Sequence, residues 1–77
     1  MDYQELKMIM RAKARLANGL VNLLKDDTEQ MCIDVDDFDM YSLGEAIREA
    51  KRTSQNLLDT VNELERDLRL AKRDVLT

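Results

Sequence analysis

The chain has 77 residues, with sixteen acidic and twelve basic side chains, a formal net charge of −4, and neither histidine nor proline. Its single cysteine is Cys32, so neither an internal disulfide nor a cysteine–histidine zinc site can hold the fold together. A chain of this length rarely buries a sufficient core by itself. The sequence therefore predicts one domain, residues 1–77, that is completed by association.

Composition also argues against catalysis and against a membrane location. The chain has no histidine and only two glycines, so it lacks a histidine base, a means of activating Cys32 and a glycine-rich phosphate loop. We expect no enzyme, no metal and no cofactor. The N-terminal segment has no apolar run long enough for a signal peptide or a membrane span, and an unpaired cysteine suits a reducing compartment. These features predict a cytoplasmic protein.

The first predicted element is an amphipathic helix at about residues 2–25. Its apolar residues, from Leu6 to Leu24, fall on one wide face, and polar residues occupy the opposite face. The dipeptide Asn18-Gly19 could interrupt this helix, because it tolerates left-handed backbone geometry. The apolar periodicity continues beyond Gly19, so we expect a single helix.

An acidic loop is expected to follow at about residues 26–42. Residues 26–45 contain eight acidic side chains and no basic one, interleaved with large apolar residues. We expect the first helix to fray by about residue 31 and the loop to fold its apolar side chains over the end of the bundle. Interleaved apolar and acidic groups suit a basic or hydrophobic groove on a partner protein. The candidate partner-binding residues are Ile33, Val35, Asp36, Asp37, Phe38, Asp39, Met40 and Tyr41.

Residues 34–45 overlay part of a twelve-residue calcium loop. Phe38 stands at the fifth position, where a ligand is required, and Asp39 stands at the sixth, where glycine makes the sharp turn. We therefore favour an acidic loop that is solvated, or that attracts a basic partner, over a calcium site.

A second, longer helix is expected from residue 43 to about residue 75. The run Ser42-Leu43-Gly44-Glu45 fits a capping box, which places the N-cap at Ser42. Apolar residues then recur at alternating spacings of four and three, the heptad pattern of coiled coils and bundles. The predicted oligomer interface consists of Ile47, Ala50, Ser54, Leu57, Val61, Leu64, Leu68, Ala71 and Val75.

These elements predict an all-α helical hairpin. If Leu24 lies near Ile47, Tyr3 lies opposite Leu68, and the last turns of the long helix overhang with nothing from the same chain to cover them. Exposed apolar patches of this kind mark interfaces. We therefore expect a homodimer that forms a four-helix bundle or a coiled-coil-like assembly.

Lys13 lies in the middle of the first helix's apolar face. We expect it to extend its charged end outward or to pair with Asp59, which the hairpin register places nearly opposite. Together with Ser54 it would form a polar layer that fixes register.

Two functions are compatible with such an assembly. The first is a small dimeric regulator, adaptor or inhibitor that binds and masks a partner protein, as accessory factors of bacteria and their phages do. The second is a nucleic-acid-associated regulator, whose basic contacts would be Lys7, Arg11, Arg15, Arg66, Arg69 and Arg73. The acidic chain carries no recognition motif for DNA or RNA, which favours the first function. A hetero-oligomer, in which a different protein covers the overhang, is a further alternative.

Overall fold

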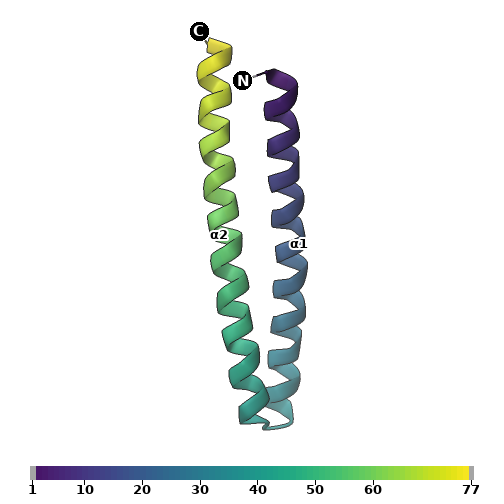
Figure 1. Ribbon diagram of the computed structural model, residues 1–77. Helices are drawn as coiled ribbons and strands as arrows, with labels where there is room; N and C mark the ends of the chain where they lie inside the picture. Colours follow the sequence, from purple (N-terminus) through teal and green to yellow (C-terminus); the bar gives the residue numbers. More distant parts are fainter. Residues whose placement is uncertain (1, 77) are drawn as a thin grey trace.

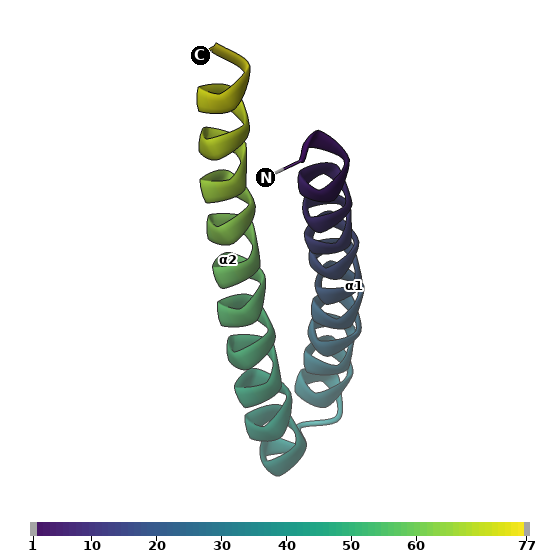
Figure 2. The same ribbon diagram turned by 45° about the horizontal axis from the view of Figure 1, so that its top comes forward.

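The protein is an antiparallel helical hairpin in a computed structural model that describes residues 2–76, with side chains up to residue 73. Helix α1 spans Tyr3–Asp36 and helix α2 spans Met40–Leu76. The helices lie side by side from the turn to the open end, where both termini are found (Figure 1, Figure 2). The hairpin is 58 Å long and only 15 by 13 Å across. The predicted all-α hairpin is confirmed.

Helix α1 is longer than the sequence pattern indicated. It continues without a break through Gly19, as expected, and then on to Asp36, so the irregular loop expected at residues 26–42 is wrong. No proline or glycine occurs between Gly19 and Gly44 to stop a helix. Met31 and Asp34 also continue the column of residues that faces α2, being half-buried and buried respectively. Packing against α2 therefore outweighs the mutual repulsion of the acidic side chains.

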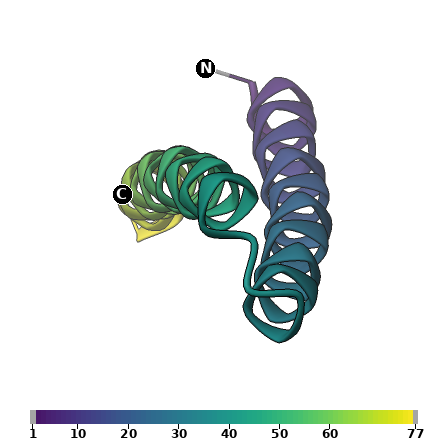
Figure 3. The same ribbon diagram turned by 90° about the horizontal axis from the view of Figure 1, so that it is seen from below.

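A short turn of residues 37–39 connects the two helices (Figure 3). Its backbone hydrogen bonds close α1 with a Schellman motif. The amide of Phe38 donates to the carbonyl of Val35 at 3.1 Å, and the amide of Asp39 donates to the carbonyl of Asp34 at 2.8 Å. Phe38 has a φ of 55° and occupies the position that is usually glycine in this motif. A bulky aromatic residue is therefore held in left-handed backbone geometry at the end of the molecule.

Asp39 also begins α2. Its Oδ1 accepts the amide of Ser42 at 3.1 Å, and its carbonyl accepts the amide of Leu43 at 3.0 Å. This is the geometry of an N-cap residue, so the N-cap is Asp39 and the prediction of Ser42 is wrong. Glu45 pairs with Arg48 in the next turn. The short turn restarts the helix before the expected capping box is reached.

The contact between the helices, which we call the seam, uses only part of the predicted heptad stripe. Ala46, Thr53 and Thr60 are buried, and Asp67 continues this column with a side chain 15% exposed. The half-buried column beside it contains Ala50, Leu57, Leu64 and Ala71, whereas Ile47, Ser54, Val61 and Leu68 remain exposed. The side chain of Val75 lies outside the described residues. The seam is therefore displaced by one residue toward a column of small side chains, which allows close approach of the helices.

The seam register is set by two polar contacts. Lys13 Nζ lies 2.7 Å from Asp67 Oδ2, and the Thr53 hydroxyl donates to Asp27 Oδ2 at 3.4 Å. The expected pairing of Lys13 with Asp59 is wrong. The turn is centred near residue 38, later in the chain than the centre of the expected loop at residues 26–42, so each residue of α1 lies opposite a later residue of α2.

The same shift removes most of the overhang expected at residues 70–76. Tyr3 and Ala71 line one groove between the helices, near the open end of the hairpin. Nearly the whole of α2 is therefore accompanied by α1. Within the helices as described, no segment is both long and apolar enough to cross a membrane.

Candidate interaction surfaces

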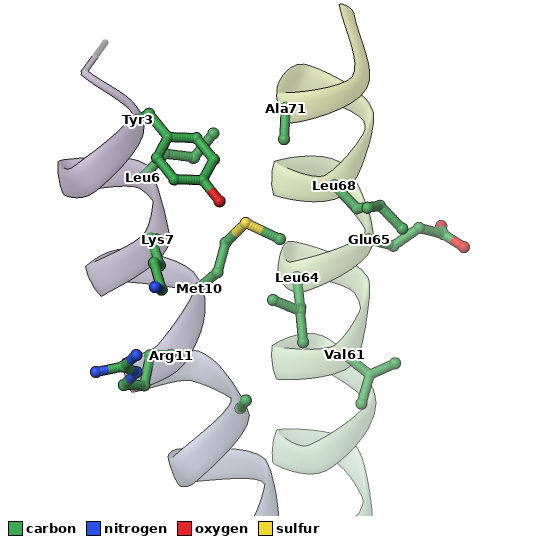
Figure 4. A pocket seen from close by; sticks show the side chains of 11 residues that line it. Tyr3, Leu6, Lys7, Met10, Arg11, Val61, Leu64, Glu65, Leu68 and Ala71 are labelled. Atoms are coloured by element: carbon green, nitrogen blue, oxygen red, sulfur yellow. The ribbon is translucent and has the colours of Figure 1, made fainter. Parts of the chain in front are cut away.

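A groove opens along one flank of the hairpin near its open end. Tyr3 and Met10 project from α1 toward Leu64 and Ala71 of α2, and Lys7 lies at the edge of the α1 side (Figure 4). The complete lining is Tyr3, Leu6, Lys7, Met10, Arg11 and Ala14 from α1, with Val61, Leu64, Glu65, Leu68 and Ala71 from α2. Its floor is apolar, and its charged groups stand at the rims.

A second groove lies nearer the turn, on the same flank. Its lining residues are Met31 from α1 and Ile47, Ala50, Lys51, Ser54, Gln55 and Leu58 from α2. Residues seven apart share one face of a packed helix. Ile47 and Ser54 of this groove thus belong to one column with Val61 and Leu68 of the first groove. We call this flank, carrying both grooves, the groove face.

The hairpin exposes more surface than a compact protein of its mass. Its accessible area is 6120 Å², whereas a compact monomer of 9.0 kDa exposes about 4,900 Å². The excess of about 1,200 Å² exceeds the roughly 800 Å² that one partner contributes to a standard interface. Among the described residues, the buried apolar side chains are Leu6 and Ala46. The predicted interface residues therefore have two roles. Ala50, Leu57, Leu64 and Ala71 are half-buried at the seam, whereas Ile47, Ser54, Val61 and Leu68 are exposed on the groove face.

The turn forms a second exposed apolar region, which we call the tip and define as residues 33–41. Phe38 is 80% exposed and Tyr41 is 79% exposed. Ile33, Val35 and Met40 are each more than half exposed. The predicted partner-binding residues are therefore brought together by a tight turn and two helix ends, and their apolar side chains do not cover the bundle as expected.

The tip is also acidic. Asp36, Asp37 and Asp39 are exposed, and the last turn of α1 holds no basic residue. Asp34 is 3% exposed, and its Oδ2 is buried without a hydrogen-bond partner among the described residues. In the part of the chain that is described, no three carboxylate or cysteine groups are placed to hold a metal ion. The tip thus offers aromatic and aliphatic surface surrounded by negative charge.

The basic residues of the predicted nucleic-acid surface lie on different faces. Lys7 and Arg11 line the first groove, and Arg15 is exposed one turn further along α1. Arg66 directly precedes the seam residue Asp67, and Arg73 lies seven residues after Arg66, so both lie on the flank of α2 opposite the grooves. Arg69 pairs with Glu65 at 2.8 Å. The two helices therefore do not combine these residues into one basic strip.

Sequence reasoning missed Thr53, Thr60 and Asp67 as inward-facing residues, because attention to apolar side chains selects the neighbouring column. Their seven-residue spacing from Ala46 is the signal that identifies them. Comparison with protein-family models, curated proteins and solved structures gives no match.

Proposed function

We propose that this chain is a non-enzymatic protein-binding module. It dimerises through the groove face into a four-helix bundle and uses the tip to bind and mask a partner protein, as a small regulator, adaptor or inhibitor. The observation that carries this proposal is Phe38, which combines left-handed backbone geometry with nearly complete exposure.

Phe38 is an unfavourable residue for the fold alone. Left-handed geometry costs a residue with a Cβ about 1–2 kcal/mol, a penalty that glycine avoids. An aromatic ring that is 80% exposed recovers little of that free energy by packing. Strained residues of this kind collect at functional sites, and aromatic side chains are enriched at the centre of protein interfaces. A bound partner accounts for a phenylalanine at this position.

The surroundings of Phe38 describe the partner. Tyr41 supplies a second exposed aromatic ring, and Asp36, Asp37 and Asp39 supply carboxylates around it. Complementary charge at the rim of an interface speeds association and excludes wrong partners. The partner surface that fits is an apolar depression with basic residues at its edge.

The groove face supports dimerisation. Its exposed column, Ile47, Ser54, Val61 and Leu68, continues the heptad spacing but lies beside the seam within the chain. The excess accessible area exceeds the roughly 800 Å² that one protomer contributes to a standard interface. A second copy would complete the core that two helices leave open.

The test compares wild type with Phe38→Ala and Phe38→Gly, immobilised and exposed to a lysate of the source cells at about 150 mM salt. Phe38→Ala removes the ring and keeps the backbone strain, whereas Phe38→Gly removes both. We expect both variants to lose the same captured protein by at least tenfold. Phe38→Gly should meanwhile gain about 1 kcal/mol in free energy of unfolding.

Met8→Ala is the matched control, because Met8 is 69% exposed but lies far from the tip. This variant should retain the captured protein. Equal capture by all four proteins would overturn the proposal. So would capture of nucleic acid alone that weakens steeply between about 50 and 200 mM salt.

A further inference from the structure

We infer that the second copy docks on the groove face in the antiparallel orientation, so that the two tips lie at opposite ends of the dimer. This inference rests on the proposed dimer and adds its geometry. Both orientations of two stacked hairpins can bury the groove face, so a property that differs along the length of the hairpin must decide between them.

The groove face carries one column from each helix along almost its full length. Tyr3, Met10 and Met31 are separated by multiples of seven residues, so they belong to one column of α1, and they line the two grooves. Ile47, Ser54, Val61 and Leu68 form the matching column of α2. Such columns pack against their own copies in helix bundles. Apolar packing therefore selects this face, and it is compatible with either orientation.

Charge differs strongly along the hairpin. The half nearer the turn, residues 20–58, contains nine acidic and four basic side chains. The half nearer the open end contains seven acidic and eight basic side chains. A parallel dimer would bring two strongly acidic halves together, whereas an antiparallel dimer places each beside a slightly basic half. Most of these charges lie outside the two groove linings, and the charged residue in the lining nearer the turn is Lys51, so the repulsion acts between the net charges of the two halves. This net repulsion favours the antiparallel dimer.

The seam register identifies the centre of that dimer. Lys13 pairs with Asp67 and Asp27 contacts Thr53, so the level midway between these contacts passes near Leu20 and Thr60. Val21 and Val61 lie close to this level, and each is 47% exposed. Maximal overlap of two antiparallel hairpins therefore brings each Val61 near its counterpart in the other copy.

This geometry gives the dimer two binding ends. Each hairpin is 58 Å long, so tips at opposite ends are separated by nearly that length. The dimer would then connect two partner molecules, or two sites of one elongated partner, and bivalent attachment raises apparent affinity. A parallel dimer would instead combine both tips into a single surface.

The first test measures the distance between two tips. The protein carries Asp37→Cys in a Cys32→Ser background, is labelled with a nitroxide at the exposed turn, and is studied by pulsed electron spin resonance. The antiparallel dimer predicts about 50 Å, from about 1.5 Å per helical residue. A distance below about 30 Å would establish the parallel dimer and overturn this inference while leaving the proposed dimer in place. A monomer in sedimentation would overturn both.

The second test uses cross-linking. Val61→Cys in the Cys32→Ser background should form a disulfide-linked dimer under mild oxidation, because disulfides require Cβ atoms about 4 Å apart. In the parallel arrangement Val61 lies beside α1 of the other copy, and no self-cross-link forms. Leu16→Cys, on the opposite edge of the hairpin, is the matched control and should remain unlinked. Cross-linking of Leu16→Cys with none at Val61→Cys would overturn the inference.

Discussion

The side-chain amide of Gln30 donates to Oδ1 of Asp34 at 2.9 Å, in the last turns of α1. The other oxygen of this carboxylate is buried and has no hydrogen-bond partner among the described residues. A carboxylate near the C-terminus of a helix also meets the negative end of the helix dipole. The isolated hairpin thus keeps an acidic group where its fold would prefer a neutral one.

Asp34→Asn is therefore expected to stabilise the hairpin by about 1 kcal/mol, because it removes a buried charge and keeps an acceptor for Gln30. Urea unfolding followed by circular dichroism measures this change. Asp36→Asn, at an exposed position of the same turn, should have a smaller effect. A loss of stability in Asp34→Asn would show that the charge of Asp34 is used within the fold.

The ion pair between Lys13 and Asp67 is expected to stabilise the seam. Their side chains are 26% and 15% exposed, which places the pair between exposed and fully buried ones. Lys13→Ala should lower the free energy of unfolding by about 1–2 kcal/mol, since it leaves Asp67 partly buried without its strongest partner. The double variant Lys13→Met, Asp67→Met should recover most of the loss. Additive effects of the single substitutions, at one fixed protein concentration, would argue against coupling.

Two helical glycines offer stabilising substitutions. Gly19 lies within α1 and Gly44 within α2, neither has a positive φ, and an added Cβ would meet nothing within 4 Å at either position. Gly19→Ala and Gly44→Ala should each raise the free energy of unfolding by about 0.5–1 kcal/mol, because alanine loses less backbone freedom on folding. Ala12→Gly, at an exposed position of α1, should produce the opposite change. Destabilisation by Gly19→Ala would indicate that another chain packs closely against that position.

The proposed dimer predicts that a charged substitution weakens dimerisation on the groove face and has no such effect on the opposite edge of the hairpin. Val61 lines the first groove, whereas Leu16, three residues after Lys13, lies on the edge of α1 away from the column of Tyr3, Met10 and Met31. Val61→Lys should weaken dimerisation at least a hundredfold, because it buries an unpaired charge in the interface. Leu16→Lys should leave the dimer intact. Sedimentation at micromolar concentrations measures both, and dissociation by Leu16→Lys alone would assign the interface to the other flank.

The helices of this fold were predictable from the sequence, whereas the turn was not. Heptad spacing requires a long helix at residues 43–75, and the apolar face of residues 2–25 requires a second one. The turn depends on Phe38 adopting a geometry that sequence rules reserve for glycine or asparagine. No glycine or proline marks the turn at residue 38, and the acidic composition of residues 26–45 is typical of a loop, although packing keeps the segment helical as far as Asp36.

The candidate surfaces were predictable in composition but not in orientation. The exposed apolar residues of the tip were identified from their interleaving with acids. The seam column lies one residue before the predicted apolar column, since Thr53 and Thr60 are buried in place of Ser54 and Val61. Threonine is not an apolar residue, so a search for apolar spacing does not select it. The apolar stripe of α2 is wide enough to pack against both α1 and a second chain. The sequence alone does not show which of its columns contacts α1.

The contacts Lys13–Asp67 and Asp27–Thr53 are two heptads apart on each helix. An aliphatic seam looks much the same after sliding by one heptad, so it permits alternative alignments of nearly equal energy. Here, sliding α2 by one heptad would set Lys13 against Thr60 and Asp27 against Ala46, stranding a cation and an anion at once. The two contacts therefore disfavour this one-heptad slide, because it would leave Lys13 without a carboxylate and Asp27 without a hydroxyl on α2.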